Sequence, residues 1–95
     1  MLKQINTDDT NFNIVINSAI RYAIGRKTYV PNAVIDFVTP LLADLPTLTL
    51  ENIKKEIMLN YENSFLGDSD IDKSAWLNFL AKVRMEIDKR KEEIG

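Results

Sequence analysis

Four segments of this chain carry apolar side chains at three- and four-residue steps, the spacing of one face of an α-helix. No segment shows the alternation of a convincing strand. The first helical segment is expected from about Thr10 to Ile24. Asp8, Asp9 and Thr10 are all good N-cap types, and Gly25 ends the helix because glycine enters left-handed backbone conformations without a steric penalty. The apolar face of this segment comprises Phe12, Ile16, Ala19, Ile20 and Ala23.

The second segment is expected to begin near Pro31, since the missing N–H of proline costs nothing in the first turn of a helix. Pro40 lies inside this segment and should kink it or split it, with Thr39 capping a short second piece. Pro46 closes it. The apolar face comprises Val34, Phe37, Val38, Leu41 and Leu45.

The third segment is expected from about Leu50 to Ser64, with Thr47 or Thr49 as its N-cap and Gly67 as a stop. Its apolar face comprises Leu50, Ile53, Ile57, Tyr61 and Phe65.

The fourth segment begins near Asp70 or Asp72 and runs to about Glu93. Its apolar face comprises Trp76, Leu80, Val83, Ile87 and Ile94, and charges of alternating sign follow the opposite side at Lys82, Glu86, Lys89 and Glu93. Because there is no repeat, linker or low-complexity block, residues 1–95 are predicted to form a single all-α domain. We expect a small bundle of four helices, the second kinked or split at Pro40.

Composition argues against catalysis. The chain has no histidine and no cysteine, so it lacks the commonest acid–base group and metal ligand as well as thiolate chemistry. Asp68, Asp70 and Asp72 resemble the start of a calcium loop, but Lys73 and Phe79 occupy the places that need glycine and glutamate. We therefore interpret these aspartates as helix caps. No enzyme activity, cofactor or metal ion is expected.

The location of the protein follows from two other features of the sequence. No apolar run approaches the length of a membrane span, and the first residues lack the apolar segment of a signal peptide. A cytoplasmic protein is therefore expected.

The stretch from Arg21 to Tyr29, RYAIGRKTY, gathers cations and phenols around Gly25. It has three interpretations. In the structural one, the tyrosines pack at the edge of the core and the cations cap helix carbonyls. In the second, Arg26 and Lys27 contact nucleic-acid phosphate while a tyrosine stacks on a base. In the third, Tyr and Arg anchor a protein partner. The net charge of −2 favours protein over nucleic acid.

The outer face of the first segment supplies a second candidate contact patch. Ile14, Asn17 and Arg21 share that face, where an isoleucine among polar side chains is unexpected. The predicted partner-binding residues are therefore Arg21, Tyr22, Arg26, Lys27, Tyr29, Ile14 and Asn17.

The string RYAIGRKTYV resembles a motif of small bacterial and phage-encoded proteins of unassigned function, in which R-Y-A-hydrophobic-G-R-x-T-Y joins two helices. The match comprises Arg21, Tyr22, Ala23, Gly25, Arg26, Thr28 and Tyr29. The resemblance implies a phage or mobile-element origin and no chemistry. Small, mildly acidic, cysteine-free phage proteins often block a host protein, as inhibitors of CRISPR-type defence do, although no inhibitor motif is present here.

We therefore expect a non-enzymatic binding protein whose partner is a host protein. Two alternatives remain at this point: a small nucleic-acid-binding regulator that uses the same turn, and a structural subunit of a phage assembly. A homodimer is compatible with each reading, because a small domain gains stability by burying more surface.

Overall fold

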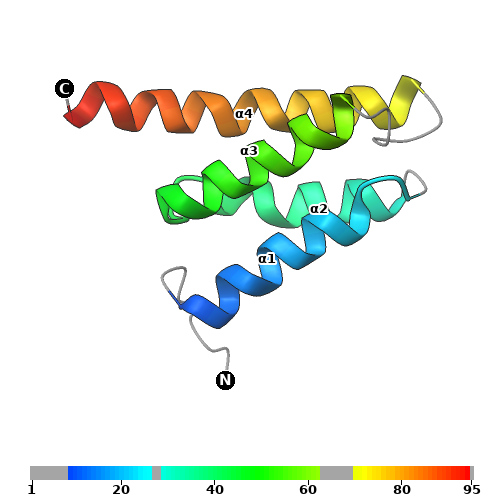
Figure 1. Ribbon diagram of the computed structural model, residues 1–95, viewed down its shortest axis with the longest axis horizontal. Helices are drawn as coiled ribbons and strands as arrows, with labels where there is room; N and C mark the ends of the chain where they lie inside the picture. The colour runs from blue at the N-terminus through cyan, green and yellow to red at the C-terminus, as the bar shows by residue number, and fades with distance from the viewer. Residues whose placement is uncertain (1–8, 27–28, 63–69, 95) are drawn as a thin grey trace.

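The computed structural model describes residues 9–26, 29–62 and 70–94. Every regular element within these ranges is helical. The elements are α1 (Thr10–Ala23), α2 (Tyr29–Val38), the 3₁₀ turn η1 (Thr39–Leu41), α3 (Thr47–Glu62) and α4 (Asp70–Ile94). The predicted all-α bundle of four helices is confirmed. Figure 1 shows α1 and α4 at opposite edges of the molecule, and each of them packs against both α2 and α3.

Local chemistry sets the ends of two of the helices. The Asp9 carboxylate caps α1 by accepting hydrogen bonds from the backbone N–H groups of Asn11 (2.7 Å) and Phe12 (3.4 Å). At Pro40 the second segment splits: α2 ends at Val38 and continues as η1. The predicted cap is wrong, because Thr39 is the first residue of η1 and its hydroxyl donates back to the Ile35 carbonyl at 2.6 Å. Proline has no N–H to donate to the carbonyl four residues earlier, so the regular helix cannot continue through it.

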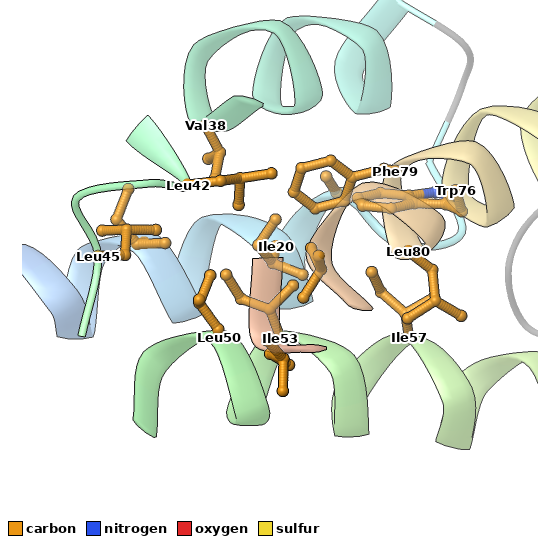
Figure 2. Packing of buried hydrophobic residues seen from close by; sticks show 14 residues of the cluster. Ile20, Val38, Leu42, Leu45, Leu50, Ile53, Ile57, Trp76, Phe79 and Leu80 are labelled. Carbon is orange, nitrogen blue, oxygen red and sulfur yellow. The ribbon is translucent and has the colours of Figure 1, made fainter. Parts of the chain in front are cut away.

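The core is one cluster that draws buried side chains from all four helices and from the turn after η1 (Figure 2). Trp76 and Phe79 of α4 form an edge-to-face pair with ring centroids 6.2 Å apart. The other buried apolar residues are Ile16, Ile20, Ala23, Val38, Leu42, Leu45, Leu50, Ile53, Ile57, Leu80, Val83 and Ile87.

Two predicted core residues are wrong. Phe37 is 51% exposed, because it lies on the flank of α2 beside Val38, the residue that turns fully into the core. Tyr61 is 55% exposed, because it lies one residue before the end of α3 and beyond its last buried residue, Ile57. Phe79 and Leu42 are buried although the predicted faces left them out.

The predicted start of the third helix also needs correction. α3 begins at Thr47, so Thr47 and Thr49 lie inside its first turn instead of before it. The hydroxyl of Thr49 is buried and donates to Oδ1 of Asn13 on α1 at 2.7 Å. α2 likewise begins at Tyr29, two residues before Pro31. Some predictions concern positions outside the described residues or side chains: Asp8, Lys27, Thr28, Ser64, Phe65, Gly67, Asp68, Asp70, Asp72, Glu93 and Ile94.

Candidate recognition surface at the α1–α2 corner

The corner between α1 and α2 is built around Gly25. Ile24 leaves the helix in an extended conformation while its N–H still donates to the Ile20 carbonyl at 3.1 Å. Gly25 then takes a φ of 84°, in the left-handed region that favours glycine. The N–H of Arg26 returns to the carbonyl of Ala23 at 3.0 Å. Arg26, the residue after Gly25, is exposed at this turn.

Arg26 folds back onto the last turn of α1. Its guanidinium lies over the Tyr22 ring, 4.4 Å from the centroid, and its Nε donates to the Tyr22 carbonyl at 3.2 Å. The same side chain thus caps a free carbonyl at the helix C-terminus and stacks on an aromatic face. The structural interpretation predicted the carbonyl cap, and Arg26 confirms it.

Two tyrosines remain exposed at this corner. Tyr22 is 60% exposed and Tyr29, the first residue of α2, is 71% exposed. Neither ring is buried in the core cluster. The surface formed by Tyr22, Arg26 and Tyr29 is called the corner below. It presents two amphipathic rings and one cation to the solvent, which is the composition of an interface anchor.

Arg21 and Asn17 belong to a different place from the corner. Arg21 approaches Glu56 of α3, with its Nε 3.5 Å from the carboxylate, and its side chain is 69% exposed. Together with Asn17 it lines a polar hollow of about 250 Å³ between α1 and α3, to which Asn52 and Lys55 also contribute. The sequence could not show this neighbour, because Glu56 lies on another helix.

Ile14 is 56% exposed, as the outward-facing interpretation of this side of α1 predicts. Ile14 does not line the hollow that contains Asn17 and Arg21. The predicted patch of three residues is therefore divided between an exposed apolar side chain and a polar cleft. Lys27, the remaining predicted contact, lies outside the described residues.

A second hollow lies where the sequence analysis placed no site. It measures about 420 Å³ and separates the segment Thr39–Ala43 from α4. From α4 it is lined by Lys82, Met85, Glu86 and Lys89. Their three- and four-residue spacing puts these four side chains on one helix face, which the sequence does indicate. The opposite wall depends on how α2 packs on α4, and no local pattern reports that.

Within the residues that the structure describes, no group of three histidine, cysteine, aspartate or glutamate side chains is placed to hold a metal ion. None of the described helices is long and apolar enough to cross a membrane. Comparison of the chain with protein-family models, curated proteins and solved structures finds no match.

Proposed function

We propose that this chain is a non-enzymatic binding protein and that the corner is its contact with a partner protein. The observation that carries the proposal is the pair of exposed tyrosines, Tyr22 at 60% and Tyr29 at 71%, one before and one after Gly25 in the chain. Tyrosine and arginine are the side chains most often found at the energetic centre of protein interfaces. The stack of Arg26 on Tyr22 orders both groups in advance, which lowers the entropy that binding must overcome.

The charges around the corner favour a protein over a nucleic acid. Arg26 already bonds to a helix carbonyl, and Arg21 lies beside Glu56. A surface that holds phosphates needs several cations free to approach them, against a net charge of −2 for this chain. An aromatic anchor with one ordered arginine fits a partially apolar protein surface better.

The proposed origin of the protein and the proposed identity of its partner rest on the sequence motif and not on the fold. The resemblance of RYAIGRKTY to a motif of small phage-encoded proteins supports a phage or mobile-element origin. We propose that the protein acts in the cytoplasm of a bacterial host and inhibits a host protein, for example a defence protein of the CRISPR type. Inhibition then arises from coverage of the partner's surface.

The test compares two double variants in affinity capture from nuclease-treated bacterial lysate, followed by a binding assay with the captured protein. The corner variant carries Tyr22→Ala and Tyr29→Ala. The control carries Leu48→Ala and Tyr61→Ala, which remove side chains of comparable exposure from α3. Loss of two anchor residues should weaken binding at least ~10-fold. Both variants should change the free energy of unfolding by less than about 1 kcal/mol.

Equal capture by the corner variant and the wild type would show that the corner is not the site. Retardation of DNA or RNA that falls steeply between low and moderate salt would support a nucleic-acid partner instead. Large assemblies on sizing would support the structural-subunit alternative. Inhibition is tested separately, by assaying the activity of the captured protein with and without this chain.

A further inference from the structure

The hollow between η1 and α4 separates two walls of opposite charge. The wall formed by α2, η1 and the turn after them, residues 29–46, carries only two charged side chains, Asp36 and Asp44, both exposed. The opposite wall, on α4, carries Lys82 and Lys89. The Glu86 carboxylate between these lysines is held by Arg90 at 3.0 Å. Neither aspartate lines the hollow itself, but Asp44 directly follows the lining residue Ala43. The side formed by residues 29–46 therefore carries acidic charge beside the hollow, and the α4 side carries basic charge.

None of these four charges forms an ion pair with another side chain that the structure describes. Within residues 9–26, 29–62 and 70–94, the ion pairs closer than 4.0 Å are Arg21 with Glu56 and Arg90 with Glu86. Asp36 of α2 lies one helical turn before Thr39 and Pro40 of η1, which border the hollow.

Between the charged walls the surface is apolar. Met85 of α4 is 71% exposed and Pro40 of η1 is exposed, and both side chains line the hollow. Side chains of this size are the usual source of affinity in an interface, and charges at the rim fix its orientation. This surface, comprising Asp36, Pro40, Asp44, Lys82, Met85 and Lys89, is called the groove face below.

We propose that the groove face is the dimer interface of this protein and that its occupant is a second copy of the chain. An isologous interface requires a patch that is complementary to itself, with both signs of charge on either side of an apolar centre. The groove face meets that requirement. A purely acidic partner segment would suit Lys82 and Lys89 but would be repelled by Asp36 and Asp44, and a basic segment meets the opposite conflict.

The charge pattern also selects the direction of the two-fold axis. An axis along the groove places the acidic wall of one copy over the basic wall of the other, whereas an axis across it superposes like charges. Figure 1 shows that α2 and α4 run in the same direction, and Arg90 donates to the Ala43 carbonyl at 3.1 Å. The turn that carries Asp44 therefore lies level with the end of α4 that carries Lys89. Rotation about an axis parallel to the groove does not change the position of a residue along the groove. Asp44 of one copy therefore lies opposite Lys89 of the partner subunit, and Asp36 lies opposite Lys82 of the partner subunit.

Two charge-reversed variants of the full chain test the arrangement by sedimentation equilibrium. The first carries Asp36→Lys and Asp44→Lys, which makes both walls basic. The second carries Lys82→Glu and Lys89→Glu, which makes both walls acidic. We expect the wild type to dimerise and each variant alone to dimerise at least ~10-fold more weakly, because like charges then face each other at both edges. An equimolar mixture of the two variants should form a heterodimer, because every facing pair is again opposite in sign.

The control variant carries Arg84→Glu and Lys91→Glu, the same charge change on exposed positions of α4 that do not line the groove. It should dimerise like the wild type, and far-ultraviolet circular dichroism of every variant should match the wild-type helix content. A wild type that stays monomeric at all concentrations overturns the proposal, and so does a mixture that fails to associate. None of these variants changes a residue of the corner. The dimer experiment therefore does not test the proposed function, which is tested separately by the capture experiment.

Discussion

Gly25 shows how a single backbone angle sets the direction of two helices. Its φ of 84° is inside the region where a Cβ atom clashes with the backbone. Gly25→Ala should therefore lower the free energy of unfolding by about 1 kcal/mol, as measured by denaturant titration. Gly25→Asn should cost less, because asparagine tolerates the left-handed region better than alanine does. Equal losses for the two variants would mean that the turn does not depend on this angle.

Thr49 makes a hydrogen bond that joins the beginnings of two helices. Its hydroxyl is buried and donates to Oδ1 of Asn13, 36 positions earlier in the chain. Thr49→Val keeps the shape of the side chain and removes the donor, so the free energy of unfolding should fall by about 1 kcal/mol. Ser18→Ala removes an exposed hydroxyl from the middle of α1 and serves as the control, which should be near neutral. If both variants unfold at the same denaturant concentration, this bond contributes nothing to stability.

Local chemistry is the part of the candidate site that the sequence reports. Glycine at the end of an apolar helix and a basic residue beside it predict the turn and the capped carbonyl, and Gly25 and Arg26 show both. The ion pair of Arg21 with Glu56 is different, since it depends on how α1 packs on α3. The groove face could not be predicted for the same reason, because its hollow forms only where residues 39–43 lie beside α4 in the folded chain.

At the scale of the elements, hydrophobic periodicity predicts the presence of a helix more accurately than it predicts how far the buried face of that helix extends. The apolar spacing located all four helices, and Pro40 indicated the break that follows Val38. The errors occur at Phe37 and Tyr61, which follow the apolar pattern but lie where no neighbouring element covers them. A helical pattern says which side chains share a face, whereas burial depends on the reach of the helices packed against that face.

Arg90 fastens the turn after η1 and the start of α3 to α4. Its guanidinium donates to the carbonyls of Leu42 (3.2 Å) and Ala43 (3.1 Å) and to the Thr47 hydroxyl (2.9 Å). Its Nε also bonds to the Glu86 carboxylate at 3.0 Å. A lysine ammonium has no fork of five donors and cannot satisfy all of these acceptors at once.

Arg90→Lys should therefore lower the free energy of unfolding by about 2 kcal/mol, although the charge is unchanged. Arg84→Lys, an exposed position on the same helix, is the matched control and should be neutral. Thermal denaturation of the two variants and the wild type gives the comparison. A midpoint for Arg90→Lys that equals that of Arg84→Lys would show that the charge alone matters at this position.

At the scale of the whole molecule, the protein is a slab. Its extents are 40 × 36 × 17 Å, so the shortest dimension leaves space for little more than one layer of core side chains between helices. The single core cluster therefore includes residues from every helix, and no helix can leave it without exposing the others. Unfolding should be one cooperative transition, seen at the same denaturant concentration by circular dichroism and by Trp76 fluorescence.

Ile53 tests this cooperativity because it is fully buried in α3, within a cluster that also contains side chains of α1 and α4. Ile53→Ala removes packing that the thin core cannot replace, so the free energy of unfolding should fall by about 2–5 kcal/mol, a large share of the ~5–15 kcal/mol typical of a domain. Leu48→Ala, at a position 73% exposed on the same helix, should have little effect. Both optical signals should move together to lower denaturant in Ile53→Ala. If only the circular dichroism shifted and Trp76 kept its wild-type midpoint, α3 and α4 would unfold as separate units and the single-core account of this fold would be wrong.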